Sequence, residues 1–528
     1  MRPSRILPTL AAVLACCGPS EPARDASTLD AADVSWTLPD ARPDTSGDPR
    51  LYVYVADGLR NDGLPCKLTI RGINGTPTPD WGDAGQRGEW LDREHMALGI
   101  GRWVLLARGW AVLSLPAGRY HVTASRGPEY AALDLGDVAI GTQQGAVVSG
   151  SLQRVVNTEG LIAGEFHVHS SPSYDCSVPI DQRVLSLAAE GVEVFASTDH
   201  DALGDFQPAI DALGLTRFIH WMKGDEISAD GFGHFGAYPL PDGFDPAVRL
   251  NPANYYSVME IVTRAREVMQ GGVMQLNHPL WRDHPIGYWS LAGFDPMTGA
   301  SSMTLVTQFD AVEVFNGHTL DQSDAGFVPV DDVIDAWMAT LQLGHRSTAM
   351  ANSDTHRLAH SPPGWPRTYL RVAIDDPASV TDAMVVSAIL AGDAVLSSGP
   401  LVSATIGATR SGGLARAAAG RVVVHVELQS SAWTPVSRVQ VLANRTVVAT
   451  RAVTATASGD LLRETWDVPV ELTRDAWIVV RADSPDPLPD HAGTYARSLP
   501  SMTLASPIYV DTDGDGTWTA PGAVTAGP

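Results

Sequence analysis

The stretch GEFHVHSSPSYDCS, residues 164–177, decides how the rest of the chain is interpreted. It places His167 and His169 at alternate positions of an expected β-strand and follows them with Asp175. Residues two apart on a strand face the same side, so both imidazoles are expected to point in one direction. One interpretation is a polar strand edge with solvated histidines, and the other is the first part of a metal site. A single pair of this kind is more often structural, so the other segments of the chain must decide.

From residue 162 onward, short apolar strands alternate with helical segments. The expected strands cover 162–169, 192–198, 218–224, 273–277, 309–317, 347–352 and 394–399, and the expected helices cover 180–191, 256–270, 330–344 and 379–392. Helices of this length between strands predict right-handed crossovers and a parallel sheet. Because so many units follow one another, the pattern favours an α/β barrel over an open sheet.

Two strand-rich regions flank this predicted barrel. They consist of short alternating runs between Gly and Pro residues, such as LYVYVAD from residue 51 and RVVVHVELQ from residue 421. Alternation of apolar and polar residues predicts strands with one buried face. We therefore expect an N-terminal β-sandwich at 49–157, the barrel domain at 158–400 and a C-terminal β-sandwich at 401–528.

The N-terminus indicates export. Arg2 and Arg5 precede the apolar run ILPTLAAVLA, which is too short to span a bilayer. The following VLACC resembles a bacterial lipobox, which makes 1–17 a lipoprotein signal peptide and Cys16 the lipidated residue. An ordinary secretory signal is the alternative. Residues 18–48, rich in Pro, Asp and Ser, are expected to form a flexible tether. The predicted location is a bacterial membrane surface, periplasmic or extracellular, with the lipid anchor as the only membrane contact.

The charge balance excludes some partners. The chain of 528 residues carries 36 Lys and Arg against 60 Asp and Glu, a net charge of −24. Nucleic acids and anionic lipid surfaces both attract basic patches, so neither is an expected partner. Outside the signal peptide the only cysteines are Cys66 and Cys176. A disulfide between them is compatible with export, but nothing in the sequence places them close together, and free thiols are favoured.

Most expected barrel strands are followed by a ligand-type side chain. These residues are His167, His169, Asp175, Asp199, His200, Glu226, His234, His278, Asp354 and His356. Parallel-barrel enzymes gather their reacting groups at the carboxyl ends of the strands. Imidazoles together with carboxylates suit Zn²⁺, Mn²⁺ or Fe²⁺, and a carboxylate can bridge two cations. The recurrence of these residue types from strand to strand predicts a metal site.

The segments HVHSSPSYD, STDHD, a Glu followed by GHF, NHP and NSDTH resemble, in this order, the PHP (polymerase and histidinol phosphatase) metal-dependent hydrolases. GHFGAYPL and DAVEVFNG look like the CehA/McbA-like branch of that family. The resemblance covers about residues 164–400. It implies a distorted (β/α)₇ barrel that binds two or three metal ions.

The resemblance also implies which residues hold each ion. His167, His169 and Asp354 would join Glu226 around the first ion, and Glu226 would bridge to a second ion held by His234 and His278. Asp175, His200 and His356 would hold a third ion, which is the uncertain one because an aspartate stands where some relatives have histidine. Asp199 is expected to orient a histidine rather than to bind metal.

Other polar residues near these motifs allow two interpretations each. His284 is either a general acid or a loop histidine. Arg282, Arg357 and Arg367 either clamp a negative substrate group or are solvated, and solvation is favoured. His220, His318, His345 and His360 lie in no motif and are expected to be structural or at the surface. Cys176 is not expected to be a nucleophile.

The C-terminal DTDGDGTW contains Asp511, Asp513 and Asp515 in the spacing of a calcium loop. Gly522 stands where such a loop has its twelfth-position glutamate, so an acidic surface turn is favoured over a Ca²⁺ site.

The predicted activity is hydrolysis of an ester-type bond in a small molecule or phosphoester by a hydroxide that bridges the metal ions. The bond is a carboxylic ester or carbamate, as the CehA-like resemblance implies, or a phosphoester, as in many PHP relatives. The alternative of another class is a surface-anchored binding protein with a non-catalytic structural metal site.

Overall fold

The computed structural model describes residues 43–60, 62–82, 86–229, 231–244, 257–282, 286–318, 328–359, 361–454, 459–489, 492 and 499–522. The predicted signal peptide, the lipidated Cys16 and most of the tether lie outside this range, as does His284. The last residues before the first strand are already ordered, since Ser46 forms a β-bridge with Gln144.

The N-terminal part is built from two sheets. Its strands are β1 (Arg50–Asp57), β2 (Cys66–Ile73), β3 (Glu89–Asp92), β4 (Ala97–Ile100), β5 (Trp103–Leu106), β6 (Trp110–Ser114), β7 (Gly118–Ser125), β8 (Leu133–Ile140) and β9 (Ala146–Leu152). One sheet has the order β6-β1-β9 and the other the order β3-β4-β5-β2-β7-β8. The alternate buried residues of β1 and β2, such as Val53 and Leu68, share one hydrophobic cluster, so the two sheets pack against each other.

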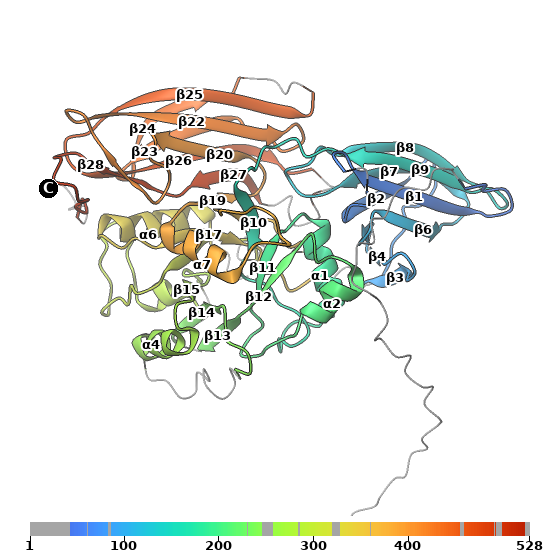
Figure 1. The fold of residues 1–528 in the computed structure, drawn as a ribbon, viewed down its shortest axis with the longest axis horizontal. Helices are drawn as coiled ribbons and strands as arrows, with labels where there is room; N and C mark the ends of the chain where they lie inside the picture. The colour runs from blue at the N-terminus through green and yellow to red at the C-terminus, as the bar shows by residue number, and fades with distance from the viewer. Residues whose placement is uncertain are drawn as a thin grey trace, which may run out of the picture. The chain divides into compact units, whose positions relative to one another are not determined.

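The central part alternates strands with helices. Its strands are β10 (Leu161–Glu165), β11 (Val194–Ser197), β12 (His220–Lys223), β13 (Asp225–Ala229), β14 (Gly233–Tyr238), β15 (Val273–Leu276), β16 (Ala311–Asn316), β17 (Thr348–Asn352), β18 (Arg367–Arg371) and β19 (Ala394–Ser397). Its helices are α1 (Ile180–Ala189), α2 (Gln207–Leu213), α4 (Val258–Met269), α5 (Tyr288–Leu291), α6 (Val330–Gln342) and α7 (Asp382–Ala391). Figure 1 shows α1 and α2 beside β11 and β12, and α6 and α7 beside β17.

The helix ends follow from local sequence. Ser257 caps α4 by accepting a hydrogen bond from the backbone N–H of Glu260, which is the capping-box spacing. Thr381 caps α7 in the same way, and Gly392 ends that helix in the left-handed conformation. None of the described helices is long and apolar enough to cross a membrane; the longest, α6, has 13 residues.

The central sheets are only partly parallel, in contrast to the prediction. β10, β11 and β12 pair in parallel, as do β15, β16 and β17. β13, β14 and β15 instead form antiparallel pairs, and β18 runs antiparallel to β10. A short loop explains the β13–β14 pair, because a parallel pair needs a long crossover and only a few residues separate these two strands. The fold is therefore mixed α/β, with more strand than helix.

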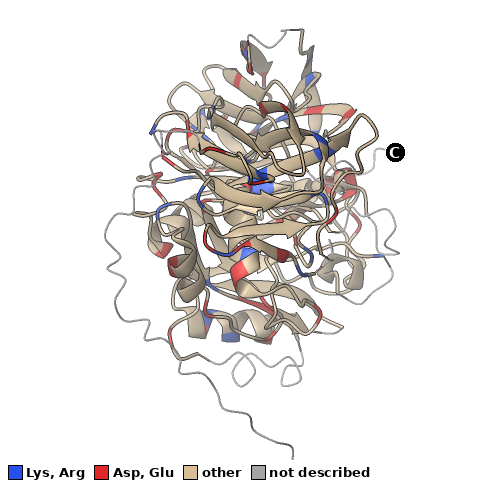
Figure 2. Ribbon diagram, turned by 90° about the vertical axis from the view of Figure 1, so that its right-hand side faces the viewer, with Lys and Arg blue, Asp and Glu red and all other residues tan. Residues whose placement is uncertain are grey.

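The C-terminal strands continue a central sheet. They are β20 (Leu401–Ile406), β21 (Leu414–Arg416), β22 (Arg421–Ser431), β23 (Arg438–Ala443), β24 (Thr446–Ala452), β25 (Leu461–Glu471), β26 (Ala476–Pro487), β27 (Pro500–Ala505) and β28 (Ile508–Asp511). β27 pairs with β19, so one sheet runs from β12 to β24, while β20, β22 and β25 form a second sheet. Acidic and basic residues are interspersed over the described ribbon (Figure 2).

Candidate metal centre

The structure brings all nine predicted metal ligands together. His167 and His169 follow β10, Asp175 lies in the loop before α1, His200 follows β11, Glu226 is on β13, His234 is on β14, His278 follows β15, and Asp354 and His356 follow β17. These residues fall into overlapping groups whose ligand atoms lie within 4.8 Å of one another. The two histidines of the opening stretch lie just beyond the strand rather than on it, because β10 ends at Glu165 and Val168 makes only a bridge to Thr355.

Glu226 lies at the centre of the cluster. Its side chain is fully buried, and both of its oxygens face imidazoles. The distances to Oε1 are 3.1 Å from His167 Nε2, 3.4 Å from His234 Nδ1 and 3.3 Å from His278 Nε2, and those to Oε2 are 3.3 Å from His169 Nε2 and 3.1 Å from His200 Nδ1. Burial opposes the charge, but the imidazoles of His167 and His200 hold the pKa of Glu226 well below its usual range. Glu226 is therefore a carboxylate in a position to bridge two cations.

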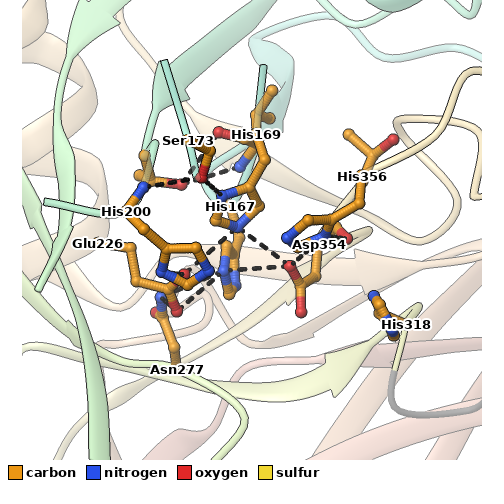
Figure 3. Close-up of polar contacts among 12 residues, drawn as sticks. His167, His169, Ser173, His200, Glu226, Asn277, His318, Asp354 and His356 are labelled. Atoms are coloured by element: carbon orange, nitrogen blue, oxygen red, sulfur yellow. Dashed lines mark hydrogen bonds and ion pairs between the residues drawn. The ribbon is translucent and has the colours of Figure 1, made fainter. Parts of the chain in front are cut away.

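Asp354 closes the cluster on another side. Its Oδ1 lies 3.3 Å from His167 Nε2, 3.2 Å from His169 Nε2 and 3.3 Å from His356 Nδ1. Figure 3 shows the side chains of His167, His169, Glu226 and Asp354 turned toward one another. His167 and His169 thus contact both carboxylates, as the motif resemblance implies for ligands of one ion.

Asp175 lies at the outer edge of the cluster, with its side chain 35% exposed. Its Oδ2 is 3.2 Å from His200 Nε2 and 3.2 Å from His356 Nε2. Burial opposes the charge, but hydrogen bonds from these two imidazoles hold the pKa of Asp175 well below its usual range. Asp175 therefore faces the two residues predicted to share the third ion.

The cluster fits divalent cations. Five buried atoms of its members make no hydrogen bond to any described residue. Four of them face other members of the cluster, namely His169 Nε2, His234 Nδ1, Glu226 Oε2 and Asp354 Oδ1, and the fifth is His278 Nδ1. Buried polar atoms normally have a hydrogen-bond partner, so four convergent exceptions are what a shared metal ligand set leaves when the ion is removed. Imidazole and carboxylate together are compatible with Zn²⁺, Mn²⁺ or Fe²⁺.

The backbone at two of the ligands is also strained. His278 has φ 23° and Asp354 has φ 51°, both in the left-handed region that favours glycine. Non-glycine residues in this region collect at functional sites, where the surrounding structure holds them in place.

Sequence reasoning missed the residue that orients the first ligand. Glu313, a fully buried residue of β16, accepts a hydrogen bond at Oε1 from His167 Nδ1 at 2.9 Å. This contact leaves His167 Nε2 directed at the cluster, as in metal sites where a carboxylate fixes the histidine tautomer. The Oε2 atom of Glu313 accepts a hydrogen bond from the backbone N–H of His278 at 2.8 Å. The only signal in the sequence was a carboxylate inside an otherwise apolar strand.

Two further polar residues at the cluster lay outside the predicted set. His318, which was expected to be structural or at the surface, groups with Asp354 and His356 as a ligand-type residue. It follows the end of β16 by two residues, so the search for ligand-type side chains after each expected strand could have found it. Asn277 Nδ2 donates to Glu226 Oε1 at 2.9 Å (Figure 3).

The structure changes the predicted roles of Asp199 and Arg367 and leaves Arg282 exposed, as favoured. Asp199 accepts hydrogen bonds from the backbone N–H and Oγ of Ser170, at 2.5 and 3.0 Å to its two oxygens, so it braces the backbone after His169 rather than orienting a histidine. Arg282 lies 3.7 Å from Asp332 with its side chain 57% exposed, as a solvated residue does. Arg367 is fully buried, and neither predicted role fits it.

Arg367 instead joins the central and N-terminal parts. Its Nη1 donates to Glu129 Oε1 at 3.1 Å, and its Nη2 donates to the carbonyl of Glu190 at 2.7 Å. Glu190 also forms a buried ion pair with Lys67 of β2. The N-terminal sheets are therefore fixed to the central part by buried charges.

The N-terminal part also reaches the loop that carries Asp175. The Gln182 side chain of α1 accepts from Gly88 N at 2.9 Å and donates to Gly88 O at 3.2 Å. Ser177 Oγ donates to Gln86 Oε1. Both contacts lie on the C-terminal side of Asp175 and connect its loop and α1 to the N-terminal part.

The cysteines and the C-terminal loop are the remaining features that the sequence singled out. Cys66 and Cys176 are free and buried, and Cys176 Sγ donates to the carbonyl of His356 at 3.2 Å. Asp511 accepts from the backbone N–H groups of Gly514 and Gly516 at 2.6 and 2.9 Å, so it stabilises the turn. The calcium site stays a prediction.

Comparisons with protein-family models, with curated proteins and with solved structures find no match for this chain. The geometry of the cluster and the order of its motifs therefore carry the functional inference.

Proposed function

We propose that the chain is a metal-dependent hydrolase of the PHP type, resembling the CehA/McbA-like branch, that cleaves an ester-type bond. The observation that carries the proposal is Glu226, a fully buried carboxylate with five imidazoles within 3.4 Å of its two oxygens. A purely structural role does not require five imidazoles, which repel one another when protonated, around one carboxylate. A cluster that shares two or three divalent ions does require such a set of ligands.

The ions would supply Lewis-acid activation of the scissile bond and would lower the pKa of a coordinated water to about 7. The chain's own residues set the geometry for this chemistry. Glu313 holds His167, and Ser173 Oγ lies 3.1 Å from His169 Nδ1, so both imidazoles present Nε2 to the cluster. No cysteine is required as a nucleophile, in agreement with the buried Cys176, whose pKa is raised by burial.

The exposed rim of the cluster is where substrate would enter. Tyr174, adjacent to Asp175, is 76% exposed, and its ring stacks on His200 with centroids 4.8 Å apart. A metal-ligand histidine covered by an exposed aromatic ring offers a flat apolar contact beside the reacting centre. This surface supports a small organic ester or carbamate at least as well as a bare phosphate monoester.

The finer architecture and location belong to the same proposal. The central strands and helices would form the distorted (β/α)₇ barrel that the motifs imply, with a β-sandwich on either side. The chain would be an exported lipoprotein anchored through Cys16. A Cys16→Ser precursor should then remain without lipid, and unchanged acylation would exclude that anchor.

The activity test uses the chain from residue 18 onward, loaded with Zn²⁺ or Mn²⁺. Its substrates are p-nitrophenyl phosphate, bis-p-nitrophenyl phosphate, p-nitrophenyl acetate and an aryl carbamate. We expect hydrolysis of at least one ester class, with kcat/KM at least about 100-fold lower in Glu226→Ala. Glu193→Gln is the matched control, because Glu193 is a buried carboxylate that pairs with Arg154 instead of the cluster. Loaded protein that is inert on every substrate would favour the binding-protein alternative.

A further inference from the structure

A cleft of about 490 Å³ lies where the central strands meet the C-terminal sheet. Leu161 at the start of β10 lines it, whereas His167 follows the other end of that strand. The cleft is therefore separate from the metal centre. Figure 1 shows β19 and β20, which both contribute residues, close to each other at this junction. Its volume is within the range of about 300–1,000 Å³ that is usual for small-molecule sites.

The floor of the cleft consists of aliphatic side chains. It is formed by Leu161, Val395, Leu401 and Ala404, all of them buried members of one hydrophobic cluster. None of the described lining residues is aromatic, so the cleft lacks the flat ring on which a sugar would stack. The floor suits aliphatic side chains.

The rim of the cleft is charged with both signs. The positive and negative charges are equal in number. The guanidinium groups belong to Arg371, Arg410 and Arg463, and the carboxylates belong to Glu159, Asp393 and Glu427. Ser403 and Gln429 add neutral hydrogen-bonding groups from β20 and β22. A ligand that matches this rim carries a positive and a negative end on an apolar body.

The ion pairs on the rim are loose. Arg371 Nε lies 3.4 Å from Asp393 Oδ2 and makes no hydrogen bond among the described residues, and Arg463 Nη2 lies 3.8 Å from Glu427 Oε1. Direct pairs of this kind are normally about 2.7–2.9 Å long. On the same strand as Glu427, but outside the cleft, Arg421 meets Glu471 at 2.8 Å. The charged groups of the cleft thus retain capacity for ligand contacts.

We propose that this cleft binds a short peptide with free termini. The arginines receive its carboxylate, the acidic residues receive its ammonium group, and the aliphatic floor receives its side chains. This proposal is independent of the hydrolase activity, since it uses none of the residues of the metal centre.

The test measures binding of leucyl-leucine to the chain from residue 18 onward by isothermal titration calorimetry. The same measurement is made with the N-acetylated dipeptide, with its C-terminal amide and with maltose as a neutral saccharide. We expect the free dipeptide to bind and each blocked form to bind at least about tenfold more weakly, because each loses one charge-assisted contact. Maltose should not bind.

Variants locate the site. Arg410→Gln and Glu427→Gln should each weaken binding of the free dipeptide at least about tenfold, while Arg421→Gln should leave it unchanged. Metal content should be the same in all three, which separates this site from the metal centre. Absence of dipeptide binding, equal binding of the blocked forms or of maltose, or equal affinity in Arg410→Gln and Glu427→Gln would each overturn the proposal.

Discussion

Glu313→Gln tests how the metal centre is held together. Glu313 accepts hydrogen bonds from four donors: His167 Nδ1 and Asn352 Nδ2 at Oε1, both at 2.9 Å, and Asn316 Nδ2 and the backbone N–H of His278 at Oε2, both at 2.8 Å. A glutamine has one oxygen and one NH₂ group in the same place. Whichever way the amide turns, its NH₂ faces two donors, and one of these belongs to a ligand histidine.

The expected cost follows from that lost contact. A hydrogen bond to a charged group contributes about 1.5–3 kcal/mol, which equals about 10- to 150-fold in affinity. This agrees with the loss of about 10- to 100-fold that is usual when the partner of a ligand histidine is replaced. We therefore expect Glu313→Gln to weaken Zn²⁺ binding by about 10- to 100-fold.

The assay is competition for Zn²⁺ with a chromogenic chelator at neutral pH, with circular dichroism to show that the variant is folded. Glu193→Gln serves as the control, since Glu193 is a buried carboxylate that accepts from the backbone N–H of Ala163 at 2.9 Å. An unchanged zinc affinity in folded Glu313→Gln, or an equal loss in both variants, would refute this account of His167.

Two further predictions concern the rest of the chain. Arg367→Met leaves the Glu129 carboxylate buried without its cation, so the free energy of unfolding should fall by about 3–5 kcal/mol in urea titrations; a loss below about 1 kcal/mol would contradict the buried pair. Burial raises the pKa of Cys66 to about 12, and a thiol reacts as its thiolate, so at neutral pH neither Cys66 nor the buried Cys176 should react with Ellman's reagent until the chain is unfolded. Rapid labelling of the folded chain would show that the thiols are accessible. No labelling of the unfolded chain without reductant would show that they form a disulfide.

The sequence predicted the elements that depend on local pattern. The helices α1, α4, α6 and α7 lie within the expected segments, because helical sequence patterns are local features. Ser257 and Thr381 also cap α4 and α7. The nine ligand-type residues converge. Seven of them follow β10, β11, β15 or β17, as the order of the motifs indicated, whereas Glu226 and His234 lie near the starts of β13 and β14. The antiparallel β13–β14 pair was missed because no strand was expected between residues 224 and 273, and the sequences of the two strands, DEISA and GHFGAY, carry polar and glycine residues that interrupt an apolar pattern.

Other features depend on contacts between distant segments. The pairing of β19 with β27 joins residues more than a hundred positions apart, and nothing in either strand specifies the partner. Glu313 was missed because its role depends on His167, which comes from another strand. Arg367 stands beside the motifs and was expected to be solvated. In the interior the Glu129 carboxylate neutralises it, and the backbone carbonyl of Glu190 accepts a hydrogen bond from it.

The metal content of the purified chain tests the central claim most directly. Inductively coupled plasma mass spectrometry on the chain from residue 18 onward, after dialysis against Zn²⁺ or Mn²⁺ and removal of free metal, should find two or three divalent ions per chain. The Glu226→Gln variant, which keeps the shape of the side chain but loses the bridging carboxylate, should retain at most one. A metal-free wild-type chain, or equal metal content in the two proteins, would contradict the account.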